Sequence, residues 1–434
     1  MKKLTVAGVL WLVALPAAGQ APQVASFDSA WKIVQRTHFD STFNGLDWNR
    51  VRDELRPRAD AARTNEELRP ILLDMLGRLK QSHFAIIPQD QAESPENAGG
   101  AGDLAMEVRW VENALVVTEV EPGGPAARAG VKPGWILRRV GDYPADSMVA
   151  RARRDPNQRN LGSIVPRIAQ SRLNGAPEST IELEFHNAGN QPVVVNAVRR
   201  VDPGLPIKFG HLPTFYARFA DRRITHQGAQ IGAIAFNVWM TPMLARFDTA
   251  IDRQRTAHGI ILDLRGNPGG AGAMAMGLAG HFVDTTRTLG AMSSRTARQL
   301  QFNINPRRVN TQGQRVTPYS GPVAILTDEL SGSTSEVFAG GMQSIGRVRV
   351  FGTRTMGAVL PAALDRLPNG DVLYHAIADF VTPDGAVLEG RGVIPDQPVE
   401  LKRADLLAGR DPIMEAALRW IAAQRRTNTT EIKS

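Results

Sequence analysis

The spacing of apolar side chains divides the chain into regions of different secondary structure. Between residues 24 and 87, apolar positions such as Phe27, Trp31 and Val34 recur on one helix face, which predicts packed α-helices. The third of these helices opens with Thr64 and Glu67 at capping-box spacing and ends near residues 77–80. Residues 91–102 are rich in Gly, Ala, Glu and Pro, which predicts a linker.

The middle and the end of the chain have a different pattern. Residues 104–202 contain short alternating runs and glycine turns, which predict a β-rich module with one short helix. From residue 205, helical patterns alternate with short apolar runs at 231–236, 260–264, 323–327 and 348–351. This alternation predicts a mostly parallel sheet covered by helices, and a helical pattern at 412–424 closes the chain. We therefore expect a multidomain α/β protein with a helical N-terminal domain at 24–95, a β-rich domain at 100–202 and an α/β domain at 205–426.

Composition narrows the possible chemistry. The 434 residues are 43% hydrophobic and 22% charged, which excludes a largely disordered chain and a multi-span membrane protein. The chain has no cysteine, so thiol nucleophiles, disulfides and cysteine-ligated metals are excluded. Its net charge of +8 is spread along the sequence without a nucleic-acid-binding motif, and we expect no nucleic-acid partner. The densest basic cluster, at 151–154, is expected to be a solvated loop.

The first nineteen residues have the pattern of a secretory signal peptide. Lys2 and Lys3 precede an apolar run at 4–15, and small residues follow at 16–19. The run is too short to span a bilayer comfortably, and no cysteine follows Gly19 to carry a lipid. We expect cleavage after Gly19 and a mature protein that works in the periplasm or outside the cell without a stable membrane anchor.

A glycine-rich segment at 263–270, Asp-Leu-Arg-Gly-Asn-Pro-Gly-Gly, follows one of the buried strands. Its paired glycines, Gly269 and Gly270, allow a tight turn that leaves N–H groups at the carboxyl end of the strand. Such N–H groups can stabilise a developing oxyanion. By itself, a glycine-rich turn is more often only a turn. A phosphate loop is excluded because no Gly-Lys-Ser/Thr follows.

Two further segments carry candidate catalytic side chains. Ser-Gly-Ser-Thr-Ser-Glu at 331–336 leads into a helix that begins near Thr334, where the helix dipole favours a serine alkoxide. Serine and threonine are also the usual N-caps, and spacing alone favours a cap. Ser82 and His83 follow the third N-terminal helix, and histidine is the usual general base near neutral pH. The chain has eight histidines, so position alone does not identify the base.

In combination and in this order, these motifs resemble the tail-specific (C-terminal processing) and tricorn-core proteases, one family of serine peptidases. The resemblance covers nearly all of the mature chain and also includes Asp47-Trp48, a PDZ-like module and Glu-Gly-Arg-Gly-Val-Ile-Pro-Asp at 389–396. It implies a ClpP/crotonase-like α/β catalytic domain with Ser333 as the nucleophile. It also implies an oxyanion hole made by the N–H of Thr334 and one from Gly269 or Gly270.

One departure from the family pattern bears on the base. Members with a Ser–Lys dyad carry lysine in a Thr-Phe-Gly-Lys-Gly segment, whereas this chain has Thr-Met-Gly-Ala-Val at 355–359. The tricorn-like branch instead takes its base from an N-terminal Ser-His pair and adds a late glutamate. The resemblance therefore implies a Ser–His–Ser–Glu tetrad. In it Ser333 attacks, His83 moves the proton, and Glu389 orients the imidazole through Ser82.

These observations predict an exported serine endopeptidase that acts on unfolded or partly folded protein chains, without a metal or other cofactor. PDZ domains bind extended peptide ends, and the PDZ-like module is expected to recognise substrate C-termini. A purely structural role for that module is the alternative. Two other functions use the same residues or fold: a catalytically inactive ligand- or peptide-binding protein, and an esterase.

Overall fold

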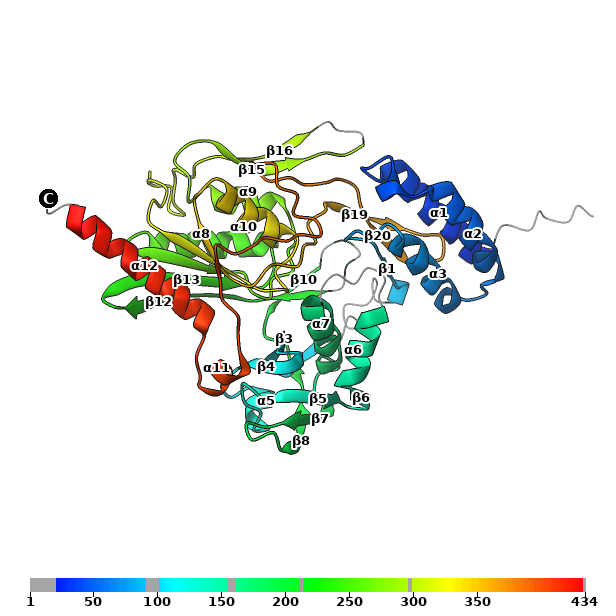
Figure 1. The fold of residues 1–434 in the computed structure, drawn as a ribbon, viewed down its shortest axis with the longest axis horizontal. Coiled ribbons are helices and arrows are strands. Elements are labelled where there is room, and N and C mark those ends of the chain that lie inside the picture. The colour runs from blue at the N-terminus through cyan, green and yellow to red at the C-terminus, as the bar shows by residue number, and fades with distance from the viewer. Residues whose placement is uncertain are drawn as a thin grey trace, which may run out of the picture.

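The structure, a computed structural model, describes residues 21–90, 101–154, 161–208, 210, 212, 214–295 and 299–431. The predicted signal peptide and most of the predicted linker lie outside these residues. The described chain forms an N-terminal group of helices, a β-rich module and an α/β part, so the predicted fold class is confirmed (Figure 1). The domain boundaries given above stay predictions. None of the described helices is both long enough and apolar enough to cross a membrane.

Three helices form the N-terminal group: α1 (Pro22–Thr37), α2 (Trp48–Ala61) and α3 (Asn65–Gly77). Their inward faces pack in one core that contains Phe27, Leu55 and Leu72, as the helical spacing predicts. At the start of α3 the predicted capping box is only half formed. The hydroxyl of Thr64 accepts the N–H of Glu67, but the carboxylate of Glu67 accepts the N–H of Arg63, one residue before the cap.

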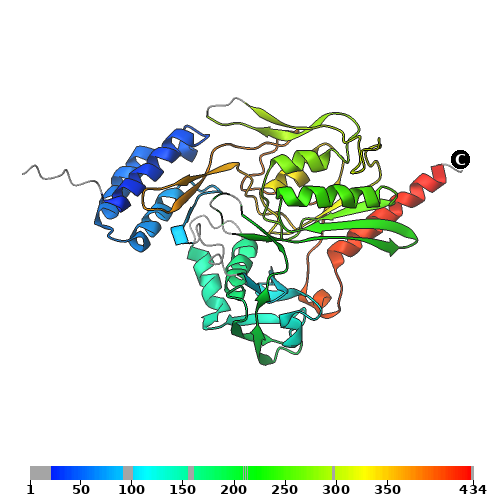
Figure 2. The same ribbon diagram turned by 180° about the vertical axis from the view of Figure 1, so that it is seen from behind.

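The N-terminal helices are joined to the distant end of the chain by a small sheet. Strand β1 (Ala85–Ile87) pairs antiparallel with β20 (Val372–Ala376), which pairs with β19 (Ala362–Arg366). Leu367 and Leu373 of this hairpin share the apolar core of α1–α3. Figures 1 and 2 show the hairpin beside the helices from both sides.

The β-rich module is an antiparallel sheet with two longer helices. Its strands and helices are β2 (Gly102–Asp103), β3 (Met106–Val111), β4 (Ala114–Val120), α5 (Pro125–Arg128), β5 (Ile136–Val140), β6 (Tyr143–Pro144), α6 (Ala145–Arg154), α7 (Leu161–Leu173), β7 (Thr180–His186), β8 (Pro192–Val198) and β9 (Arg200–Val201). The main sheet has the order β3-β4-β5-β7-β8, with β3 at one edge. The expected loop at 151–154 is wrong, because these residues form the last turn of α6. Met148 and Ala152 bury one face of α6, and arginines suit a helix C-terminus.

The α/β part contains the largest sheet, which orders the strands β12-β13-β14-β17-β18-β21. Only β12 is antiparallel to its neighbour, so the predicted mostly parallel sheet is confirmed. Its elements are β10 (Leu205–Ile207), β11 (Phe215–Ala217), β12 (Phe219–His226), β13 (Ala229–Phe236), α8 (Thr241–Gln254), β14 (Gly259–Asp263), α9 (Ala273–Ala279), β15 (Arg287–Met292), β16 (Leu300–Ile304), β17 (Val323–Thr327), α10 (Thr334–Ser344), β18 (Arg349–Gly352), β21 (Gln397–Pro398), α11 (Arg403–Leu407) and α12 (Pro412–Glu431).

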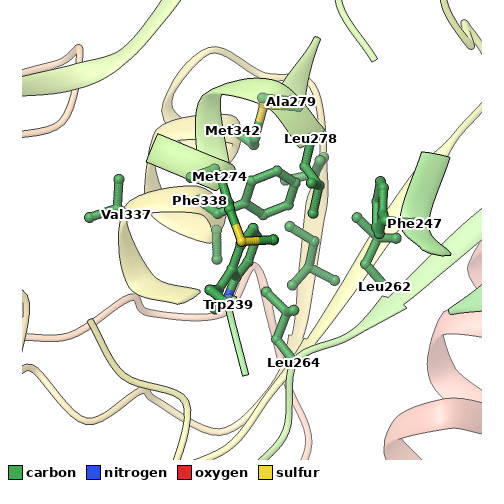
Figure 3. Packing of buried hydrophobic residues seen from close by; sticks show 14 of the residues in the cluster. Trp239, Phe247, Leu262, Leu264, Met274, Leu278, Ala279, Val337, Phe338 and Met342 are labelled. Atoms are coloured by element: carbon green, nitrogen blue, oxygen red, sulfur yellow. The ribbon is translucent and has the colours of Figure 1, made fainter. Parts of the chain in front are cut away.

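Helices cover both faces of the large sheet, and alternate side chains along its strands enter the core on one face or the other. Ile260 and Leu262 face the core formed with α8, α9 and α10, whereas Ile261 faces α12. Trp239 and Phe338 lie in the first of these cores, with ring centroids 5.2 Å apart (Figure 3). This core holds the N-terminus of α10 against the carboxyl ends of β14 and β17.

The contact between α3 and the β19–β20 hairpin gives a test of stability. Arg69 donates Nε and Nη2 to the carboxylate of Asp371 at 3.0 and 2.9 Å, and Asp371 is fully buried. Arg69→Met removes the guanidinium and leaves this buried charge without its cation. We expect a loss of about 3 kcal/mol in the free energy of unfolding, measured by denaturant titration.

Arg58→Met is the matched control, since Arg58 and Asp74 form an exposed pair with 54% and 36% of their side chains accessible. We expect it to cost less than about 1 kcal/mol. Equal effects of the two variants would contradict the structural importance of the Arg69–Asp371 pair.

Candidate active site

Ser333 lies in the turn between β17 and α10 and is the N-cap of α10. Its backbone has φ 51° and ψ −116°, a conformation that costs a non-glycine residue about 1–3 kcal/mol. Two acceptors hold its N–H: the carbonyl of Ala358 at 2.8 Å and the carboxylate of Glu336 at 3.0 Å. The strained conformation is thus fixed by contacts on both sides of the turn.

His83 lies between α3 and β1, also in a left-handed conformation with φ 61°. Its Nε2 is 3.3 Å from Oγ of Ser333, and its Nδ1 is 2.7 Å from Oγ of Ser82. The carboxylate of Glu389 accepts both the hydroxyl and the backbone N–H of Ser82, each at 2.8 Å. The structure therefore brings together the four residues that the sequence suggested for a tetrad; their catalytic roles stay predictions.

The partners in this chain of hydrogen bonds define the imidazole tautomer. A carboxylate only accepts, so the hydroxyl of Ser82 donates to Glu389 and its oxygen is left to accept from Nδ1–H of His83. Nε2 then carries a lone pair that faces the hydroxyl of Ser333. This is the arrangement that proton transfer from serine to histidine requires.

Burial lowers the pKa of His83 to about 4, against the opposing effect of the Glu389 charge. Arg167 on α7 also lowers this pKa through its positive charge. The ordinary value for histidine is 6.5, so His83 is neutral across a wider acidic range than an exposed histidine. A neutral imidazole is the form that can accept a proton.

The glycine segment lies directly beside Ser333. A Cβ on Gly269 would be 2.6 Å from Cβ of Ser333, so only glycine fits there. The N–H of Gly269 donates to the side chain of Asn267 at 3.0 Å and is therefore already engaged. Within the described residues, the N–H groups of Gly270 and Thr334 have no hydrogen-bond partner. Of the two glycines that the sequence suggested for an oxyanion hole, Gly270 is the one with a free donor.

Glu336 organises the turn that carries Ser333. It is fully buried and accepts the backbone N–H groups of Ser333, Gly357 and Ala358 and the hydroxyl of Thr355, at 2.6–3.0 Å. Burial outweighs these donors and raises the pKa of Glu336 to about 7. Sequence reasoning placed Glu336 at the end of the segment that leads into the helix but did not predict its contact with 355–358. The Ser-x-x-Glu spacing could have indicated the contact between Glu336 and the N–H of Ser333, but it gives no sign of the contacts with 355–358.

Two other neighbours of the site were not predicted. The ring of Tyr374 on β20 lies 5.5 Å from that of His83, and no pattern indicated the β19–β20 hairpin. Arg109 on β3 donates to Asp328 at 2.9 Å, and Asp328 accepts the N–H groups of Gly266 and Ser331. The β-rich module thus contacts both loops of the site. Among the described residues, no cluster of His, Asp or Glu is arranged to hold a metal ion.

Comparison with known families agrees with this geometry. The model of peptidase family S41 matches residues 230–399, which contain the glycine segment, Ser333 and Glu389. The model of the tricorn protease C1 domain matches residues 25–77, which cover α1–α3. The segment with Ser82 and His83 lies between the two matched regions.

Individual proteins are similar over most of the chain. The chloroplastic carboxyl-terminal-processing peptidase 2 of Arabidopsis thaliana is 24% identical over 88% of this chain and 70% of its own length. Tricorn protease homolog 1 of Streptomyces coelicolor is 26% identical over 90% of this chain, which spans only 34% of that protein. The solved structure of a photosystem II D1 C-terminal processing protease has the same fold, with a TM-score of 0.59 and 20% identity over 92% of this chain and 97% of that one.

The site geometry and the family match concern the same segment. Ser333 and Glu389 both lie within it, and His83 reaches them from outside. Residues 230–399 therefore match peptidase family S41, a family of serine peptidases, and the chain is similar to carboxyl-terminal-processing peptidases over most of its length.

Proposed function

We propose that the chain is an exported serine endopeptidase that forms an acyl-enzyme on Ser333, with His83 as its general base. The hydrogen-bond chain from Glu389 through Ser82 and His83 to Ser333 carries this proposal. A serine hydroxyl is a poor nucleophile without a base in reach, and here the base has a lone pair directed at it. The match of residues 230–399 to peptidase family S41 supports peptide-bond hydrolysis as the reaction.

In the first half of the reaction, Oγ of Ser333 attacks the substrate carbonyl carbon while Nε2 of His83 takes the hydroxyl proton. The imidazolium that forms is stabilised through Ser82 by the carboxylate of Glu389. The substrate oxygen gains negative charge and accepts the N–H groups of Gly270 and Thr334. His83 then gives its proton to the leaving amine as the C–N bond breaks.

The second half removes the acyl group from Ser333. Water attacks the ester carbonyl and gives a proton to His83, and the same two N–H groups hold the second oxyanion. The C–O bond to Ser333 breaks, Oγ regains the proton from His83, and the carboxylic acid product leaves. The cycle consumes one water and needs no other reactant.

The identity of the residue at position 358 supports an imidazole base. Ala358 stands where dyad members of the family carry lysine, and alanine cannot take a proton. Its backbone N–H and carbonyl are engaged with Glu336 and Ser333. His83 is the titratable group that hydrogen-bonds Oγ of Ser333.

Export and recognition of peptide ends complete the proposal. The signal-peptide pattern at 1–19 supports a location outside the cytoplasm, where unfolded or partly folded chains are the expected substrates. Strand β3 lies at the edge of the β-rich sheet, a position that allows an extended peptide to add a strand. We propose that this module binds substrate C-termini.

Covalent labelling tests the nucleophile and the base. A fluorophosphonate should label the wild-type protein on Ser333 and should not label Ser333→Ala. His83→Ala should be labelled at least ~100-fold more slowly, because the base no longer takes the hydroxyl proton. Gel fluorescence and peptide mass spectrometry measure the rate and the site.

His258→Ala is the control for the loss of an imidazole, since His258 is exposed and contacts the backbone of Gln230. It should be labelled at the wild-type rate. Labelling of Ser333→Ala, or a wild-type rate in His83→Ala, would refute the assigned pair. A wild-type protein that resists the probe and cleaves neither casein nor small esters would support the non-catalytic alternative.

The pH dependence of hydrolysis tests the environment of His83. Since burial lowers the pKa of His83 to about 4, its proton should inactivate the base well below pH 6.5. The Glu389 charge raises this pKa, so Glu389→Gln should move the acidic limb of kcat/KM to still lower pH. Glu336 makes no contact with His83. Any part of the pH profile that is due to titration of Glu336 should therefore stay at the same pH in Glu389→Gln. An acidic limb of kcat/KM that is assigned to His83 and lies at or above pH 6.5 would contradict the burial of this imidazole. Circular dichroism at each pH is the control for unfolding.

Peptide ends test the role of the β-rich module. Replacing the free C-terminal carboxylate of a peptide substrate by an amide should raise KM ~10-fold with kcat unchanged, because charge-assisted hydrogen bonds at a distant site are lost. Acetylation of the N-terminus is the matched control and should change neither constant. Equal KM values for the acid and the amide would favour a purely structural module.

A further inference from the structure

Three hydroxyl groups around Ser333 all point to carbonyls of the glycine segment. Ser331 donates to the carbonyl of Leu264 at 2.8 Å, Thr334 to that of Gly270 at 2.8 Å, and Ser335 to that of Asn267 at 3.0 Å. All three side chains are at most 3% exposed. In the run of residues 331–335, only the hydroxyl of Ser333 makes no such contact with the glycine segment.

We infer that Ser331, Thr334 and Ser335 form a hydroxyl clamp that positions the oxyanion hole. The two proposed oxyanion donors belong to different segments: Thr334 to the start of α10, and Gly270 to the glycine segment. The distance between their N–H groups is therefore set by how the segments are joined. The hydroxyl clamp joins them at three carbonyls spaced three residues apart, near the beginning, in the middle and at the end of the glycine segment.

The bonds on either side of Gly270 fix the direction of its N–H. In a trans peptide the C=O of one residue and the N–H of the next point in opposite directions. The N–H of Trp239 donates to the carbonyl of Gly269 at 2.9 Å and so directs the Gly270 N–H away from Trp239. The hydroxyl of Thr334 holds the next carbonyl, that of Gly270. The two peptide units that flank the α-carbon of Gly270 are thereby each held by a hydrogen bond.

Trp239 supports the clamp from the core. Its indole N–H donates to Oγ of Ser335 at 2.8 Å, which leaves the hydroxyl hydrogen of Ser335 free to donate to Asn267. Trp239 is fully buried (Figure 3), so its position is determined by the packing of the large core. Hydrogen bonds from Trp239 to Ser335 and from Ser335 to Asn267 thus fix the glycine segment relative to the core.

This inference rests on the proposed function, and threonine at 334 allows a test of the hydroxyl alone. Thr334→Val keeps the backbone N–H and the shape but removes the donor to Gly270, whereas Thr334→Ser keeps the donor. We expect Thr334→Val to lower kcat ~10- to 100-fold with KM unchanged. Misplaced oxyanion donors weaken the transition state, in which the substrate oxygen becomes negative, and leave binding of the neutral substrate unaffected. Thr334→Ser should stay within ~3-fold of wild type.

The affinity of a peptide aldehyde is a second measurement, and a mere loss of protein stability would not change it. It forms a hemiacetal with Ser333 whose oxygen occupies the oxyanion hole, so its affinity should fall in Thr334→Val by the same factor as kcat. The affinity of the cleaved product peptide, which forms no oxyanion, should be unchanged. Trp239→Phe should reduce kcat less than Ser335→Ala, because it removes only the bond that supports the clamp.

Ser344→Ala is the matched control, since Ser344 lies at the other end of α10 and its hydroxyl contacts only the loop at Asp384. It should keep wild-type kcat. Thr334→Val with wild-type kcat and aldehyde affinity would overturn the clamp, as would a loss that Thr334→Ser does not rescue. These outcomes are distinct from failure of the proposed function, in which Ser333→Ala would retain the hydrolysis of the wild type.

Discussion

The proposed active site depends on the pairing of one three-residue strand. His83 lies two residues before β1, and β1 pairs with β20 through Ala85–Ile87. Ser333 is 250 residues further along the chain, so no local structure brings the imidazole to it. The pairing is held by the apolar core that α1–α3 share with the β19–β20 hairpin. Burial of apolar surface in one part of the molecule therefore positions the imidazole of His83, the proposed base, in another.

Both members of the Ser–His pair sit on strained backbone. His83 and Ser333 have φ values of 61° and 51°, in a region that non-glycine residues rarely adopt. In each case a carboxylate accepts a backbone N–H at the strained turn: Glu389 accepts that of Ser82, and Glu336 that of Ser333. A hydrogen bond to a glutamate side chain thus helps to hold each turn. In both loops a glutamate side chain accepts a backbone N–H at the turn, although the loops are far apart in sequence.

The sequence predicted the elements with the strongest patterns and missed those decided by tertiary contacts. The strand at 323–327 and the helix starting at Thr334 are as expected, because the apolar run and the capping residues agree. The β15–β16 hairpin is an element that the sequence pattern missed. Its register is irregular between Thr288 and Ala291, where Gly290 packs against the carbonyl of Val381, and this irregularity interrupts the alternation of apolar and polar residues. The meeting of Ser333 and His83 followed only from a family resemblance. Spacing cannot indicate which of eight histidines lies near a given serine.

The segment at 355–359 connects the two halves of the proposed site. The N–H of Ala358 donates to Glu336, and the N–H of the next residue, Val359, donates to Glu389 at 3.2 Å. Adjacent peptide groups therefore bind the carboxylate beside Ser333 and the carboxylate beside Ser82 and His83. A backbone that performs this task needs no particular side chain at position 358, so an alanine there is compatible with an intact site. What the segment contributes is the fixed spacing between two carboxylates, and through them between the imidazole and the hydroxyl.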